Sequence, residues 1–276
     1  MSSTLNRIEL IGASGVGKTT LYEKLKTISD SSEVYMTFER ACKLAALNSS
    51  ISLSRLDLFC YQKLLKYGLI KRKHIGLSRV ILNDQINDMA KDRFMYNGFN
   101  VSFKILCHFL QEKDNPFYPF YLDNPFHVRK TINKFLQIAD NLIIINKLFT
   151  GNDMVIMDEG ILHYHPGITD YGFKNFSPEQ LKSDPVFTPF GIISCEQPVE
   201  NIFEQAMKRR KEGIQNFVHR LLNEDELFEF IKTNVEFANK KVESLKNLGI
   251  PCLHVNTGEP AHRIAKKIAQ FSAALQ

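Results

Sequence analysis

The chain has 276 residues, of which 44% are apolar, and its formal net charge is +5. The length suits one large domain or two small ones, and the mild positive charge fits an anionic ligand better than duplex nucleic acid, which usually requires a denser basic face. The most basic run, Lys71-Arg72-Lys73-His74, favours a solvated helix end over a nucleic-acid patch.

The cysteines and the apolar runs predict the compartment. The five cysteines are scattered without C-x-x-C spacing, which argues against a disulfide framework or a zinc site and favours a reducing environment. A strand and a glycine-rich loop begin almost at once, leaving no room for a signal peptide, and no apolar run reaches the roughly 20 residues that span a bilayer. We therefore expect a cytoplasmic protein without a membrane span.

The first motif is G-x-x-x-x-G-K-T, which runs from Gly12 to Thr19. An apolar run at Ile8–Ile11 precedes it, and Leu21, Leu25 and Ile28 follow at helical spacing, so the sequence predicts a strand, a loop and a helix in that order. The glycines allow successive backbone N–H groups to point at phosphate oxygens, and the helix adds the positive end of its dipole. This context favours a nucleoside triphosphate site over an ordinary glycine-rich turn.

Two side chains of this loop have separate expected roles. Lys18 is expected to reach the β- and γ-phosphates, which makes it the first catalytic candidate, and the Thr19 hydroxyl is expected to ligate Mg²⁺. The other expected cofactor-binding positions of this segment are Gly12, Ser14, Gly15, Val16, Gly17 and Thr20.

A long middle region follows the second predicted strand, Glu33–Arg40. It is far longer than a crossover helix requires, and its apolar residues suggest several helices. One of these helices begins after Asp123-Asn124-Pro125 and is predicted to carry Phe135, Ala139 and Ile143 on one side. We therefore predict a helical insertion, residues 45–150, over the functional edge of the sheet.

Three later apolar runs predict strands near Met154–Asp158, Ile192–Cys195 and Cys252–Val255. Continuous rather than alternating hydrophobicity is typical of parallel strands that are buried on both faces. A long amphipathic helix begins at Asn223–Glu226 and stops at Gly249. Alternating strands and helices predict an α/β fold with a doubly wound parallel sheet, whose ligands lie at the carboxyl ends of the strands.

Carboxylates follow two of the predicted strands. Asp158 ends a buried strand, which is where a phosphate-binding protein holds Mg²⁺, although strands also end in Asp at ordinary turns. Glu159 and Glu39 have three options each: general base, hydrogen-bond acceptor to a substrate, or solvent-facing residue. His163 and His165 are read as loop histidines near a substrate rather than as a metal pair, because no third ligand matches them.

Two other segments of the sequence bear on which reaction the loop would serve. Asn146-Lys147 lacks the Asp that completes the guanine-reading N-K-x-D element, which argues against a GTP switch. A predicted helix from Pro198 delivers the basic run Lys208–Lys211 into a mobile loop that ends at Gly213. These cations suit a lid that clamps phosphate oxygens, and they equally suit a helix C-terminus favoured by its dipole.

These parts resemble the nucleoside-monophosphate kinase group of P-loop kinases, and most closely the thymidylate kinases and their relatives. The matching stretches are "GASGVGKTT", the strand ending in "DEG", "PVENIFEQAMKRRKEG", and the helix "DELFEFIKTNVEFANKKVESL" leading to "GIPCLHVNTGEP". The middle region carries no matching motif. In this family the middle region chooses the acceptor.

The resemblance implies a five-stranded parallel sheet, ATP as donor and Mg²⁺ as cofactor. It also implies a catalytic lid arginine, Arg209 or Arg210, and it places Asn256–Gly258 near the adenine, which adds Asn256 to the cofactor-binding residues. The family's usual D-R at the metal strand is D-E here, Asp158-Glu159. The missing arginine argues against an acceptor that carries a phosphate.

We therefore predict a single P-loop kinase domain over residues 1–276, with the insertion binding the acceptor. The expected reaction moves the γ-phosphate of ATP to a small anionic or hydroxyl-bearing molecule: a nucleoside monophosphate, a nucleoside, a sugar or a glycan. A hydroxyl must lose a proton, which Glu39 or Glu159 would accept, and we favour this type of acceptor. Arg40, Arg79 and Arg93 are the candidate cations for a phosphate-bearing one.

Two further expectations concern partners. A homodimer is an option that the sequence leaves open. The alternative function is a nucleotide-gated, ATP-binding protein whose insertion grips a macromolecular partner with little or no transfer. Its support is the aromatic stretch Asn115–Phe126, which more often packs a loop onto the core.

Overall fold

The computed structural model describes residues 5–29, 35–38, 40–41, 103, 106–107, 110–111, 122–123, 125–148, 153–158, 160–163, 188–214 and 217–276. Glu39, Glu159, His165, Arg79 and Arg93 lie outside the described residues, as does most of the predicted insertion at 45–150.

The centre of the fold is a five-stranded sheet in which every strand pair is parallel. The strand order is β2-β3-β1-β4-β5. The strands are β1 (Arg7–Ile11), β2 (Tyr35–Thr37), β3 (Met154–Met157), β4 (Gly191–Glu196) and β5 (Cys252–Asn256). The predicted α/β class and the parallel five-stranded sheet are therefore confirmed. Because all strands run the same way, their carboxyl ends share one edge.

The second strand is shorter than predicted. It pairs with β3 only from Tyr35 to Thr37, opposite Met154 to Ile156, and the described residues that follow, Phe38, Arg40 and Ala41, are helical. Among the described strands β2 pairs with β3 alone, and this ladder ends where the chain turns into a helical segment. The apolar and aromatic residues that suggested strand up to Arg40 belong partly to this helical segment.

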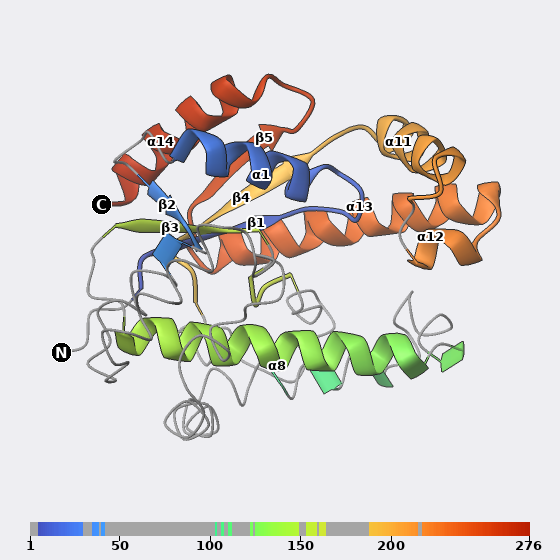
Figure 1. The fold of residues 1–276 in the computed structure, drawn as a ribbon, viewed down its shortest axis with the longest axis horizontal. Coiled ribbons are helices and arrows are strands. Elements are labelled where there is room, and N and C mark those ends of the chain that lie inside the picture. Colours follow the sequence, from blue (N-terminus) through green and yellow to red (C-terminus); the bar gives the residue numbers. More distant parts are fainter. Residues whose placement is uncertain are drawn as a thin grey trace, which may run out of the picture.

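Helices cover both faces of the sheet (Figure 1). The helices α1 (Lys18–Ser29) and α14 (Ala261–Leu275) lie on one face, and α8 (Pro125–Leu148) and α13 (Glu224–Asn247) lie on the other. Helix α11 (Val199–Lys211) and the short α12 (Phe217–Leu221) lie at one end of the molecule, beside the N-terminal part of α13. In the part of the chain that is described, no helix has both the length and the apolar character of a membrane span.

Two apolar cores follow from the alternation of side chains along the strands. Ile8 and Leu10 of β1 pack with Leu25 of α1 and Ile268 of α14. On the other side, Ile11 packs in the core that contains residues from α8 and α13. The predicted apolar side of α8 is confirmed, since Phe135, Ala139 and Ile143 are fully buried there.

Helix α13 begins and ends as the sequence predicts. Asn223 is its N-cap: the Asn223 side chain accepts a hydrogen bond from the Glu226 N–H, and the Glu226 side chain accepts one from the Asn223 N–H. Gly249, with φ of 76°, follows its last turn. This helix runs along the lower face of the sheet in Figure 1.

Candidate functional site

The glycine-rich loop connects β1 to α1 at the carboxyl edge of the sheet. Gly15 and Gly17 have φ of 88° and 96°, values that other residues rarely adopt. A Cβ on Gly12 would lie 2.5 Å from the backbone oxygen of Cys195 in β4, so the loop packs directly against the neighbouring strand. Only glycine fits these positions, which explains the spacing of the motif.

Lys18 is the first residue of α1 and is buried. Its Nζ donates hydrogen bonds to the backbone oxygens of Gly12 at 2.7 Å and Ala13 at 2.9 Å. The ammonium is thereby folded back over the loop that holds it. Thr19 and Thr20, in the first turn of α1, are exposed and stay open to solvent.

Asp158 directly follows β3, and β3 is the neighbour of β1 in the sheet. Burial raises the pKa of the Cys195 thiol in β4 to about 12, while the Lys18 ammonium lowers it and the Asp158 carboxylate raises it. Lys18 and Asp158 therefore both act electrostatically on the same buried group. The structure brings together the loop lysine and the strand-end carboxylate that the sequence predicted.

The two residues predicted to hold a metal carry oxygen atoms, which suit Mg²⁺ better than a softer metal. Asp158 offers a carboxylate and Thr19 a hydroxyl, and Mg²⁺ in phosphate sites is typically held by one or two protein oxygens together with phosphates and water. Among the described residues, no group of three His, Cys, Asp or Glu side chains forms a metal-ligand cluster. This part of the chain offers no all-protein cage for a metal.

The turn after β3 is held from two sides. Glu9 of β1 is fully buried; its Oε1 accepts a hydrogen bond from Arg7 Nε at 2.8 Å and its Oε2 accepts one from the Leu162 N–H at 2.9 Å. Lys241 of α13, also buried, donates from Nζ to the Leu162 backbone oxygen at 2.9 Å. The peptide groups on both sides of Leu162 are thus fixed by charged residues from two elements.

Sequence reasoning missed Glu9 and Lys241. The pKa of Lys241 is lowered to about 7, mainly by burial and also by the Lys18 ammonium, while the Glu9 carboxylate acts in the opposite direction. The importance of Glu9 could have been predicted, because Arg7 and Glu9 are charged residues in an otherwise apolar, buried strand. Lys241 carried no such signal, since α13 has several lysines and most of them are exposed.

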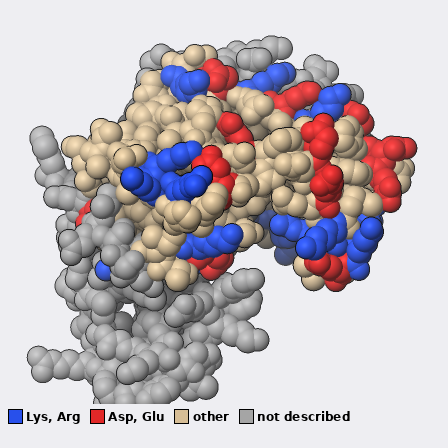
Figure 2. Space-filling view, turned by 90° about the horizontal axis from the view of Figure 1, so that it is seen from above, with Lys and Arg blue, Asp and Glu red and all other residues tan. Residues whose placement is uncertain are grey.

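The basic run Lys208–Lys211 lies in the last turn of α11, before Gly213 with φ of 70°. The four residues belong to the helix rather than to the loop that was expected, so their charges complement its dipole. Figure 2 shows basic side chains gathered at the end of the molecule where α11 and α12 lie. Arg210 donates from Nη2 to the backbone oxygens of His219 and Leu222, each at 2.7 Å. Arg210 thus ties α12 to α11.

A chain of hydrogen bonds fastens the loop to the end of β5. Gln205 of α11 donates to Gln197 at 2.8 Å, Gln197 donates to the Thr257 hydroxyl at 2.8 Å, and that hydroxyl donates to the Val16 backbone oxygen at 2.5 Å. Asn256, the expected adenine neighbour, accepts a hydrogen bond on its Oδ1 from the Gly258 N–H at 2.8 Å. These contacts link the loop, the start of α11 and the turn after β5.

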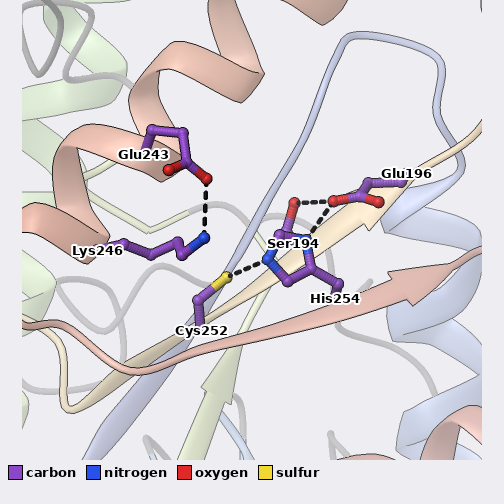
Figure 3. A network of polar contacts seen from close by, with 6 residues as sticks. All are labelled: Ser194, Glu196, Glu243, Lys246, Cys252 and His254. Carbon is purple, nitrogen blue, oxygen red and sulfur yellow. Dashed lines mark hydrogen bonds and ion pairs between the residues drawn. The ribbon is translucent and has the colours of Figure 1, made fainter.

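A cleft of about 630 Å³ opens beside the loop. It is lined by Gly12 and Ala13 of the loop, Glu196 and Asn256 of the strand ends, and Asn239 and Glu243 of α13, among others. Figure 3 shows the polar groups that β4, β5 and α13 present there.

Those polar groups are already connected to one another. Ser194 Oγ donates to Glu196 Oε1 at 2.9 Å, and His254 Nδ1 lies 2.5 Å from the same oxygen. The Cys252 sulfur lies 3.6 Å from His254 Nε2, and burial raises the pKa of its thiol to about 11. Cys252 therefore stays protonated at neutral pH and offers no ready nucleophile. The cleft is lined by polar groups that include two carboxylates and one imidazole, and Glu243 is also bonded to Lys246 at 2.9 Å.

The other residues that the sequence analysis singled out have the following positions. Asn146, in α8, accepts a hydrogen bond from the Leu5 N–H at 2.9 Å, so it anchors the chain before β1. Arg40 is exposed in the helical segment after β2. His163 lies in the turn after Asp158. Glu39 and Glu159 fall outside the described residues, and their expected roles stay predictions.

The sequence was compared with known proteins. No protein-family model matches the chain, and a search of curated proteins found no match. The function is therefore inferred from the geometry of the site.

Proposed function

We propose that this chain is a P-loop kinase that transfers the γ-phosphate of ATP, with Mg²⁺, to a small-molecule acceptor. The observation that carries the proposal is the arrangement of Lys18. Its buried ammonium is bound to the carbonyls of a loop with positive-φ glycines, at the same sheet edge as Asp158. A lysine in this position can exchange weak carbonyl contacts for phosphate oxygens without moving its backbone.

The other proposed roles belong to residues at the same carboxyl edge of the sheet. The N–H groups of Gly12–Thr20 would hold the phosphates. Asp158 and Thr19 would hold Mg²⁺, which neutralises charge on the phosphate oxygens when bound. Arg209 is favoured over Arg210 as the mobile cation, because Arg210 already donates to two backbone oxygens. We propose that Arg209 stabilises the charge that develops during transfer.

The acceptor is proposed to carry a hydroxyl group. In the transfer, the acceptor oxygen bonds to the γ-phosphorus, the bond to the β–γ bridging oxygen breaks, and ADP leaves. The hydroxyl proton passes to a carboxylate, for which Glu39 and Glu159 stay the candidates. The described lining of the neighbouring cleft supports this choice, since it includes two carboxylates and no lysine or arginine.

The proposal is tested by ADP release from Mg-ATP with a panel of nucleosides, simple sugars and nucleoside monophosphates. Lys18→Ala should lower acceptor-dependent turnover by at least a thousand-fold, because the lysine stabilises charge where it develops. Circular dichroism and urea unfolding of the same variant establish that it is folded. Lys24→Ala, an exposed lysine one to two turns further along α1, serves as the matched control and should keep wild-type turnover.

Undiminished turnover in Lys18→Ala would contradict the assignment of the loop. Acceptor-dependent turnover confined to the monophosphates would contradict the hydroxyl acceptor while leaving the kinase proposal intact.

A further inference from the structure

The side chain of His219 is buried in the part of the molecule that carries the basic end of α11. The residue is 2% exposed and lies in α12, which follows α11 in the chain. Its Nε2 is buried and has no hydrogen-bond partner among the described residues. A buried nitrogen without a partner costs about 1–3 kcal/mol, so a folded protein rarely keeps one without a reason.

The ring lies beside the tip of the glycine-rich loop. A Cβ placed on Gly15 would lie 3.9 Å from the His219 Cε1 atom and 3.3 Å from Ile202 of α11. Cε1 is bonded to Nε2, so the unpartnered nitrogen is also close to this loop. The φ of Gly15, 88°, favours glycine at this position.

The position of the ring is fixed by its surroundings. Phe230 of α13 meets it edge to face, with ring centroids 6.0 Å apart. Arg210 holds the His219 backbone oxygen. An ordinary core histidine has both ring nitrogens hydrogen-bonded, whereas the described residues leave Nε2 of His219 without a partner.

The electrostatics agree with an anionic ligand. Burial lowers the pKa of His219, and the guanidiniums of Arg209 and Arg210 lower it further. The ring is therefore neutral at pH 7 in the ligand-free chain. A phosphate group beside it would offset both arginines and accept a hydrogen bond from Nε2–H.

We propose that His219 is a phosphate-contacting residue of the nucleotide site, whose Nε2–H donates to a phosphate oxygen of the triphosphate bound in the Gly12–Thr19 loop. This inference rests on the proposed function, because it requires that the loop bind a nucleoside triphosphate. It adds a neutral donor at the loop tip to the cations Lys18 and Arg209.

The first test follows the histidine itself. The Cε1–H resonances of the protein are recorded by NMR against pH, with and without Mg²⁺ and the β,γ-imido analogue of ATP, and His219→Asn assigns the His219 signal. Binding should shift this signal and raise its pKa by a unit or more, while the signal of the exposed His262 in α14 stays where it is.

The second test measures affinity for the same analogue by calorimetry. His219→Asn, which has no donor at the Nε2 position, should weaken binding by about ten-fold or more. His219→Gln, whose amide nitrogen can reach that position, should recover most of the loss. His262→Asn makes the same chemical change at an exposed site and should bind like the wild type. Urea unfolding of each variant separates loss of affinity from loss of fold.

Two results would overturn the role of His219 alone: an unmoved His219 signal while the wild type binds the analogue, or wild-type affinity in His219→Asn. If the wild-type chain does not bind the analogue, the proposed function fails and the role of His219 fails with it.

Discussion

Gly160 lies in the turn after β3, against the carboxylate of Glu9. A Cβ at this position would lie 2.0 Å from Glu9 Cδ and 2.1 Å from Oε2. Glu9 has no room to move aside, because it is fully buried and bonded to Arg7 and to the Leu162 N–H. The absence of a side chain at residue 160 is therefore what allows the turn that carries Asp158 to sit on β1.

Gly160→Ala should lower the free energy of unfolding by about 2–4 kcal/mol, since a methyl group would have to displace a buried, hydrogen-bonded carboxylate. Urea unfolding measures the loss. In a Glu9→Ala background the same substitution should cost much less, so the double-mutant cycle gives a large interaction energy. Additive effects of the two substitutions would show that Gly160 and Glu9 are not in contact.

At the scale of single residues, the sequence predicted where the residues of the glycine-rich motif would lie. Gly12, Gly15 and Gly17 have positive φ, and Lys18 donates back to the Gly12 oxygen in the turn between β1 and α1, where the motif lies; the binding of phosphate there stays a proposal. It did not predict His219, because a histidine after a basic run has no spacing that marks it as buried. That property depends on how α12 folds back onto α11, which a linear pattern does not contain.

At the scale of elements, the strands could be predicted because each contains an apolar run, and α13 because its apolar residues recur at helical spacing. β3, β4, β5 and α13 were placed within a residue or two for this reason. The edge strand β2 was predicted too long, since half-buried aromatic residues suit a strand and a packed helix equally. Polar contacts between elements, such as the hydrogen bond from Thr257 to Val16, could not be predicted from the pattern of apolar residues.

Thr257→Val tests how the glycine-rich loop is fastened to the end of β5. Valine keeps the shape but leaves the Val16 oxygen and the Gln197 amide without this hydroxyl. We expect a loss of about 1–2 kcal/mol in unfolding free energy, and weaker binding of Mg-ATP because the loop is less well ordered. Thr233→Val is the control: its hydroxyl bonds only to the Glu229 oxygen of its own exposed turn. Equal effects of the two variants would contradict a special role for Thr257.

At the scale of the whole molecule, alternation of strands and helices predicted one parallel sheet with a common functional edge. The sequence could not indicate that polar contacts tie the turn after β3 to β1 and to α13 near that edge. β1 contributes Arg7 and Glu9 to the face covered by α8 and α13, and Lys241 reaches the same turn from α13. The contacts that Glu9 and Lys241 make with Leu162 join residues far apart in the chain. In the sequence, each of these residues looks like an ordinary charged residue.

Lys241 should make the stability of the whole chain depend on pH. Its pKa is lowered from 10.5 to about 7, so between these values the unfolded chain holds a proton that the folded chain lacks. Unfolding free energy therefore rises with pH across this window, by at most about 1.4 kcal/mol per unit, and the contribution is lost as pH falls toward 7.

Lys241→Met removes the titrating group. The stability difference, wild type minus variant, should thus increase by more than about 1 kcal/mol between pH 7.5 and 9.5 in urea unfolding. Lys240→Met, the same change at the exposed neighbour, should leave the pH dependence of the wild type intact. A flat difference for Lys241→Met would mean that this lysine keeps its ordinary pKa in the folded chain, and that burial beneath the Asp158 turn does not discharge it.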